Sequence, residues 1–178
     1  HPELRRREGE AYRLGLQQLV ADLQLDGHVK FIDAYVDLGM LGRWLQAADL
    51  FVTPYPGAEQ AVSGTLAYAL GSGKAIVSTP YAYARELLAD GRGRLVPFGD
   101  SAALGREIAD LLTDRSARDE ARRRAYAYGR RMTWPRVGQA YRALFHEVQL
   151  EFAGGEPAPM GRLSDVAGIA AHEARTVG

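Results

Sequence analysis

Two short apolar runs separated by a segment of helix length constrain the fold most. Residues 49–54 (DLFVTP) and 74–79 (KAIVST) both have the composition of buried strands. Between them, residues 55–73 begin as a loop and continue with small residues that favour a helix. Because a parallel return needs a connection of helix length, this order predicts βαβ units. The predicted fold class is α/β, a Rossmann-like parallel sheet flanked by helices.

The rest of the chain extends this pattern. Helical spacing predicts a helix over 2–25, ended by Asp26-Gly27, whose buried face would hold Leu16, Leu19, Val20 and Leu23. Residues 28–35 (HVKFIDAY) alternate apolar and polar side chains, which predicts a strand. We also predict a strand over 94–98 and helices over 38–48, 83–88, 102–112, 117–129 and 135–152. Four strands are few for a sheet covered on both faces, so we expect the first strands of the sheet to be missing.

The two ends of the chain bear on its domain organisation. The chain begins with His1-Pro2 and enters a helix without a preceding strand, so we expect a piece of a longer protein. A tag remnant or a processed terminus is the alternative. We predict one partial Rossmann-like domain over 1–152. Residues 153–178 contain a linker-like GGEPAP and a short helical pattern, and we expect this tail to lead to another domain or to dock on the first.

Composition excludes several classes of protein. The 22 Lys and Arg residues balance 22 Asp and Glu residues, which disfavours a nucleic-acid coat protein, and no nucleic-acid partner is expected. The absence of cysteine excludes thiolate metal sites and cysteine nucleophiles and permits a reducing cytosol, where we expect the protein to be. The four histidines are scattered without HExxH spacing, so no metal is expected. No apolar run is long enough to predict a membrane span.

The loop after the first buried strand carries the candidate chemistry. In parallel sheets, ligands bind outside the carboxyl ends of the strands. Here Val62-Ser63-Gly64-Thr65 opens a helix, and small residues at a helix N-terminus leave backbone N–H groups accessible to an anion. We predict a diphosphate site at this turn. The alternative is structural: Ser63 and Thr65 cap the helix and Gly64 packs closely on the sheet.

Two other motifs do not support nucleotide binding. The sequence Gly71-Ser72-Gly73-Lys74 imitates the end of a P-loop, but Tyr68 stands where the first glycine is needed, and the motif precedes a strand instead of following one. No GxGxxG follows a strand, so a dinucleotide oxidoreductase has no support.

Positive charge is concentrated in one stretch. Residues 115–142 hold nine arginines against Asp119 and Glu120. These arginines could contact RNA, a membrane surface or an acidic partner. The alternative is a solvated helix surface whose methylene groups cover apolar neighbours.

From about residue 28 to 112, the chain resembles the C-terminal half of retaining glycosyltransferases of GT-B architecture, particularly family 4, the glycosyl transferases group 1. The matching stretches are HVKFIDAY, LQAADLFVTPY, QAVSGTLAYALGSGKAIVSTPY, ARELLADGRGRLVPFGD and SAALGREIADLLTD. The resemblance implies a half-molecule that binds a nucleoside diphosphate sugar without a metal cofactor. The acceptor would bind to an N-terminal half that is missing here.

The resemblance also implies which residues face the donor. The family usually shows a Glu and, after seven residues, a second Glu that grips the ribose. Aligned on Gly73, these positions hold Gln60 and Tyr68, so both acids are replaced. Gln60 can still hydrogen-bond sugar hydroxyls, Tyr68 can form one hydrogen bond or stack, and Glu59 is a substitute carboxylate. The segment expected to face the diphosphate consists of Val62, Ser63, Gly64 and Thr65.

Two functions are therefore carried forward. The first is the donor-binding half of a bacterial-type glycosyltransferase that transfers a sugar with retention, the fragment alone being inactive. The family's basic pair that neutralises the diphosphate lies upstream of this chain, and no catalytic residue is assigned. The alternative is a non-catalytic, degenerate transferase module that docks or regulates through its Arg-rich helices. Peripheral membrane contact through the same helices is a further expectation.

Overall fold

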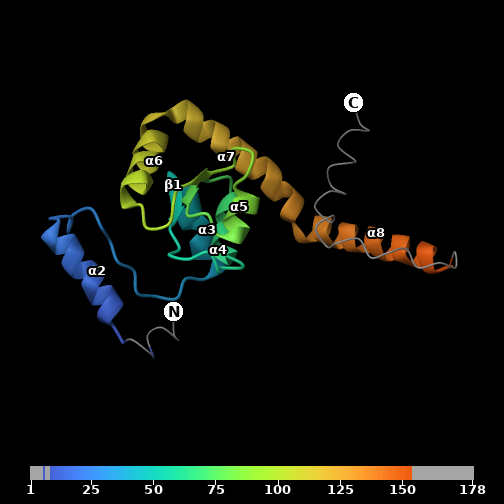
Figure 1. Ribbon diagram of the computed structural model, residues 1–178, viewed down its shortest axis with the longest axis horizontal. Helices are drawn as coiled ribbons and strands as arrows, with labels where there is room; N and C mark the ends of the chain where they lie inside the picture. Colours follow the sequence, from blue (N-terminus) through green and yellow to red (C-terminus); the bar gives the residue numbers. More distant parts are fainter. Residues whose placement is uncertain (1–5, 7–8, 154–178) are drawn as a thin grey trace. The chain divides into compact units, whose positions relative to one another are not determined.

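A computed structural model describes residues 6 and 9–153 (Figure 1). The chain divides into two units, His1–Asp37 and Leu38–Gly178, and each is treated by itself below. The predicted tail over 153–178 lies outside the described residues except for Ala153. The proposed boundary after residue 152 therefore stays a prediction.

The first unit contains the helix α2, Ala11–Asp22. It ends earlier than predicted because Gln24 adopts a φ of 56°, and the amide of Leu25 donates to Val20 O at 2.9 Å. The helix therefore stops before Asp26-Gly27. None of its residues is buried, so the predicted buried face is not covered.

The predicted strand over 28–35 is wrong. No ladder forms there among the described residues, and the amides of His28 and Val29 instead turn back to Leu25 O at 2.8 and 3.0 Å. Alternation of apolar residues makes a strand only where another strand accepts its hydrogen bonds. Phe31 and Ile32 remain exposed, which is consistent with the absence of a packed sheet face at this segment.

The second unit is built on a parallel sheet, as predicted. The strands β1 (Leu50–Thr53), β2 (Ala75–Ser78) and β3 (Arg94–Leu95) lie in the order β1-β2-β3. Leu50 is in register with Ala75, and Val77 with Arg94. The described sheet thus has three strands instead of four. β3 is shorter than predicted because Pro97 follows Val96 and has no amide with which to continue the ladder.

Helices connect and follow the strands. Their order matches the prediction, and their bounds are α3 Leu38–Ala47, α4 Gly64–Gly71, α5 Ala82–Leu87, α6 Ser101–Thr113, α7 Arg115–Gly129, the 3-10 turn η1 Arg130–Met132 and α8 Trp134–Ala153. Two of them begin with aspartate caps. Asp100 Oδ1 accepts from Ala103 N at 2.8 Å, and Asp114 Oδ1 accepts from Ala117 N at 2.9 Å.

The core lies on both faces of the sheet, because side chains along β2 alternate between two clusters. Ile76 belongs to the cluster with α3, α4 and α5, whereas Val77 belongs to the cluster with α6. α7 contributes to both clusters, through Ala125 to the first and Ala121 to the second. All four residues of β2 are buried, so this strand is the centre of the unit.

α8 remains exposed along its length. Trp134 is 86% exposed and Phe145 is 61% exposed. Tyr141 lies 6.0 Å from Phe145, ring centre to ring centre, and Phe152 continues the same stripe at helical spacing. The described residues thus leave a stripe of aromatic side chains on α8 uncovered.

Candidate functional site

The predicted loop brings α4 to the carboxyl end of the parallel sheet. Ser63 precedes the helix in an extended conformation, with φ −143° and ψ 106°, and its Oγ accepts from Leu66 N at 3.3 Å. Ser63 is therefore the N-cap, as the structural alternative stated. Its side chain is buried and holds the turn through this hydrogen bond.

Gly64 and Thr65 are exposed above this cap. A Cβ on Gly64 would meet no atom within 4 Å, so the alternative in which Gly64 packs closely on the sheet is wrong. The first amides of a helix have no acceptor within it. Leu66 N donates to the Ser63 side chain, and Ala67 N donates to Ser63 O at 3.1 Å. Gly64 and Thr65 belong to the first turn of α4, so the acceptors of their N–H groups must come from outside the helix.

The other residues predicted to bind the donor, Tyr68, Gln60 and Glu59, do not all face the turn. Tyr68, 49% exposed, lies one helical turn after Gly64 on the same side of α4. The Gln60 amide donates to the carbonyl of the exposed Val62 and so holds the loop just before the helix. The Glu59 carboxylate instead folds back over Gly57, the position that a Cβ there would occupy. Tyr68 therefore accompanies the turn, whereas Glu59 is directed into its own loop.

Sequence reasoning missed a set of hydroxyl groups beneath this turn. Ser78 Oγ donates at 3.1 Å to Thr53 O, and Thr79 Oγ1 donates at 2.7 Å to Tyr55 O. These bonds tie the ends of β1 and β2 together. A signal was present, because both strands end in Thr-Pro-Tyr, at 53–55 and 79–81. The two tyrosine rings, Tyr55 and Tyr81, meet edge to face at 5.1 Å.

Tyr81 is a buried member of this set. Its side chain is fully buried, and its hydroxyl has no partner in hydrogen-bond geometry within the described chain. Burial raises the pKa of Tyr81, while the hydroxyls of Ser63, Ser78 and Thr53 oppose that rise by stabilising the phenolate. The Tyr81 hydroxyl is thus a buried polar group without a hydrogen-bond partner among the described residues.

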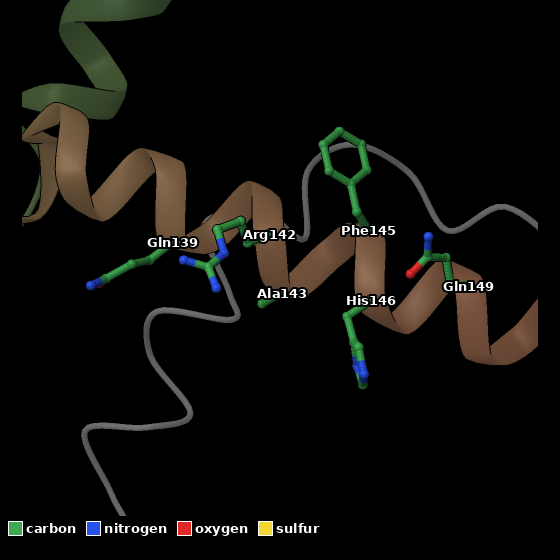
Figure 2. A pocket seen from close by; sticks show the side chains of 6 residues that line it. All are labelled: Gln139, Arg142, Ala143, Phe145, His146 and Gln149. Carbon is green, nitrogen blue, oxygen red and sulfur yellow. The ribbon is translucent and has the colours of Figure 1, made fainter.

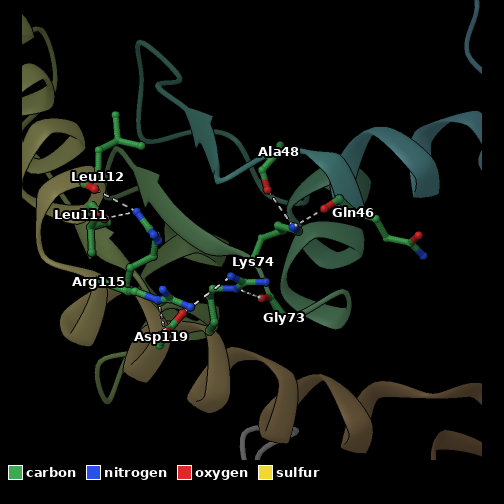
Figure 3. A network of polar contacts seen from close by, with 10 residues as sticks. Gln46, Ala48, Gly73, Lys74, Leu111, Leu112, Arg115 and Asp119 are labelled. Carbon is green, nitrogen blue, oxygen red and sulfur yellow. Dashed lines mark hydrogen bonds and ion pairs between the residues drawn. The ribbon is translucent and has the colours of Figure 1, made fainter.

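Lys74 has a structural role and takes no part in a phosphate loop. Its Nζ donates at 3.1 Å to Gln46 O and at 2.8 Å to Ala48 O, and so caps the end of α3 (Figure 3). The residue is buried, and desolvation, with a smaller effect of Arg122, lowers the pKa of its amine. This agrees with the sequence argument against a P-loop.

Many of the arginines of α7 bind within the protein. Arg118 Nη1 donates to Leu111 O and Leu112 O at 3.1 and 3.0 Å, closing the end of α6, and Arg122 Nε donates to Gly73 O at 3.4 Å (Figure 3). Others form ion pairs along the helix, Arg115 with Asp119 and both Arg123 and Arg124 with Glu120. These contacts give many of the arginines a structural role, through hydrogen bonds and ion pairs within the protein.

An open hollow lies along α8 (Figure 2). All the described residues that line it come from this single helix: Gln139, Arg142, Ala143, Phe145, His146 and Gln149. No second described element closes it. It is therefore an uncovered helix face and not a ligand site.

Two searches of the described residues gave no further candidates. Among residues 6 and 9–153, no group of three or more His, Asp or Glu side chains could hold a metal ion. Over the same residues, no helix is both long enough and apolar enough to cross a membrane.

Comparisons with solved structures place the fold. The C-terminal domain of a glycosyl transferase group 1 family protein from Francisella tularensis is similar with a TM-score of 0.58 and 21% identity, over 66% of this chain and 60% of that one. Sucrose-phosphate synthase from Thermosynechococcus elongatus is similar with a TM-score of 0.63 and 22% identity, over 77% of this chain and 35% of that one. The chain thus spans only part of each neighbour. The fold is that of the C-terminal domain of GT-B glycosyltransferases.

The family comparison agrees with the fold. No curated protein matches the chain. The model of the family described as glycosyl transferases group 1 matches residues 8–114, which include the sheet, α4 and the turn at Ser63–Thr65. The chain belongs to the glycosyl transferases group 1 family.

Proposed function

We propose that the chain is the donor-binding half of a glycosyltransferase that uses a nucleoside diphosphate sugar and transfers the sugar with retention. The observation that carries the proposal is the turn at the start of α4. Two exposed residues, Gly64 and Thr65, open a capped helix whose first amides have no acceptor within it, with open space where a side chain of Gly64 would be. Such a turn suits a diphosphate, which the helix dipole attracts.

The proposal assigns different tasks to the surrounding residues. The backbone of residues 62–65 would bind the diphosphate and stabilise the charge that develops on it as it leaves. Tyr68, on the same side of α4, would contact the nucleoside or sugar by stacking or one hydrogen bond, and Gln60 would reach sugar hydroxyls after releasing Val62 O. Glu59 would need to turn away from Gly57 to take part. No metal is included in the proposal.

The acceptor would be bound by an N-terminal half outside this chain. The aromatic stripe on α8, including Trp134 and Phe145, supports this part of the proposal because it is an apolar surface without a described partner. The isolated chain would then bind a donor without transferring its sugar.

Calorimetric titration tests the donor site directly. The chain, and a longer natural protein that contains it, would be titrated with UDP, GDP, ADP and their sugar conjugates. We expect saturable binding of one nucleoside diphosphate, weakened roughly tenfold or more by Gly64→Leu, which fills the open space. Gly105→Leu, a similar change at another uncrowded helix position in α6, should bind like the parent.

Three results would change the proposal. Unchanged affinity in Gly64→Leu would exclude this turn as the phosphate site. Binding only by the longer protein would locate essential diphosphate contacts upstream. No binding by either protein would favour the docking module. That alternative would have to use the remaining arginines of α7, because Arg118, Arg122 and Arg124 donate to carbonyls within the protein.

A further inference from the structure

Residues 55–62, called the donor loop below, connect β1 to the cap of α4 and have few bonds to the rest of the protein. Among the residues that the structure describes, one hydrogen bond joins this loop to another element: Thr79 Oγ1 donates at 2.7 Å to Tyr55 O. The bond from the Gln60 side chain to Val62 O stays within the loop. The donor loop therefore depends on Thr79 for its hydrogen-bonded tie to the end of β2.

Thr79 is well placed to serve as an anchor. Both strands leave the sheet through the same kind of turn across a proline, with Tyr55 N donating to Thr53 O at 3.2 Å and Tyr81 N to Thr79 O at 3.0 Å. Thr79 is buried, and its backbone is held by its own turn, while its hydroxyl reaches the other turn. The Thr79 hydroxyl thus fixes where the donor loop starts.

The two ends of the donor loop are held independently. At its far end, the Ser63 side chain caps α4 by accepting from Leu66 N, and this bond does not involve Thr79. Gln60 lies between the two attachments. Loss of the Thr79 hydroxyl would therefore loosen the part of the loop that carries Gln60, whereas the turn at the start of α4 would keep its own cap.

We propose that Thr79 is a positioning residue, whose hydroxyl holds the donor loop so that Gln60 can bind the sugar of the donor. This deepens the proposed function and rests on it. A loop that is already ordered loses less conformational freedom when a ligand binds, so the tie strengthens the contact with the sugar. The diphosphate, which would bind at the turn of α4, gains little from it.

Two substitutions at one position test the proposal. Thr79→Val replaces the hydroxyl with a methyl group of similar size, and Thr79→Ser keeps the hydroxyl. Each protein is titrated by calorimetry with UDP, GDP or ADP, whichever binds the parent, and with its sugar conjugate. We expect Thr79→Val to bind the sugar conjugate on the order of 3- to 10-fold more weakly and the nucleoside diphosphate roughly twofold more weakly at most. Thr79→Ser should restore most of the lost affinity.

The neighbouring residue provides the matched control. Ser78 Oγ donates at 3.1 Å to Thr53 O, at the end of β1 and outside the donor loop. Ser78→Ala also removes one buried hydroxyl, but it should leave the ratio of the two affinities unchanged. Equal weakening of both ligands by Thr79→Val would overturn the proposal, because Thr79 would then support the fold and not the loop. The same change of ratio in Ser78→Ala would overturn it as well.

A double variant tests whether Thr79 acts through Gln60. If it does, Thr79→Val should weaken binding of the sugar conjugate much less in a Gln60→Ala background than in the parent. Full additivity of the two substitutions would overturn this part of the proposal, because Thr79 would then act on the sugar without Gln60.

Limited proteolysis separates this proposal from the proposed function. Glu59 lies in the donor loop, so a glutamate-specific protease can cleave after it, and mass spectrometry identifies the fragments. Cleavage after Glu59 should be faster in Thr79→Val than in the parent or Thr79→Ser, because a loosened loop opens more often. If the parent binds neither ligand, the donor-site proposal fails, and with it the role of Thr79 in sugar binding, while faster cleavage still supports the tie to the loop. Unchanged cleavage overturns that tie whatever the binding result.

Discussion

Gly129 in α7 lies directly against Gly71 in α4: a Cβ at Gly129 would stand 2.7 Å from the Gly71 Cα and 3.2 Å from Leu70 O. The contact is backbone against backbone, so neither side can yield by a change of rotamer. The two helices approach this closely because Gly129 has no side chain; a Cβ at Gly71 would meet nothing within 4 Å. α7 thereby holds α4, whose other end carries the candidate site.

Gly129→Ala should therefore destabilise the fold by about 1–3 kcal/mol, the usual effect of overpacking. Thermal denaturation of the variant and the parent measures the difference. Gly138→Ala in α8 is the matched control, since a Cβ there meets nothing within 4 Å and alanine favours a helix by about 0.5–1 kcal/mol. Equal melting of Gly129→Ala and the parent would contradict the close approach.

Lys74→Met should destabilise the fold by about 1–3 kcal/mol, because the carbonyls of Gln46 and Ala48 lose their donor while the apolar stem is kept. Chemical denaturation measures the loss. The control is Lys30→Met at the other lysine, which is exposed and should have little effect.

The same pair of proteins tests a pH dependence. Desolvation, with a smaller effect of Arg122, lowers the pKa of Lys74 below its ordinary value of 10.5, so the folded state releases this proton at a lower pH than the unfolded state. Between the two pKa values the unfolded state binds more protons, and stability from Lys74 rises with pH. The advantage of the parent over Lys74→Met should grow as pH is raised towards 10.5. A shrinking advantage would contradict the lowered pKa.

Asp100→Ala should cost about 1 kcal/mol by removing the cap of α6, whose carboxylate accepts from Ala103 N. Asp100→Asn keeps an oxygen acceptor and should recover most of the loss. Denaturation of the three proteins at one pH gives the comparison. Equal losses in both variants would mean that charge, and not the hydrogen bond, supports the helix.

The aromatic stripe of α8 should cause self-association of the isolated chain, because an uncovered apolar surface is buried by a second copy when its partner is absent. Sedimentation velocity should show a concentration-dependent increase in mass that Phe145→Glu abolishes. Gln139→Glu adds the same charge on α8 without removing an aromatic ring and should not. A monomeric parent with a cooperative transition at high temperature would contradict this prediction.

The sequence predicted the parts of the fold whose signals are local. The buried strands β1 and β2 and the helices after residue 38 depend on apolar runs and helical spacing, which the sequence shows directly. The segment 28–35 was misjudged because its alternation is a strand signal only when a partner strand is present. The strand predicted over 94–98 was too long, because Pro97 has no amide with which to continue the ladder.

The sequence predicted the exposed turn of the candidate site but not the buried hydroxyl groups at the ends of the strands. Ser63, Gly64 and Thr65 were found from their place at a helix start. The hydroxyl groups at the ends of β1 and β2 were missed because the register of the two strands brings them together. Thr53 lies beside Ser78 only once β1 and β2 pair. Tertiary packing likewise decides whether Gly64 faces open space or the sheet, and the spacing of residues in the sequence does not reveal it.

The pairing of the sheet also determines how this chain can fold. Leu50 pairs with Ala75 and Val77 with Arg94, so each ladder joins residues that are about 25 and about 17 positions apart. Neither ladder can form from a local turn, and each must wait until an intervening helix has been brought over the sheet. During synthesis, β1 therefore leaves the ribosome well before its neighbour exists. Its apolar residues stay unpaired for that interval, during which they need protection from aggregation.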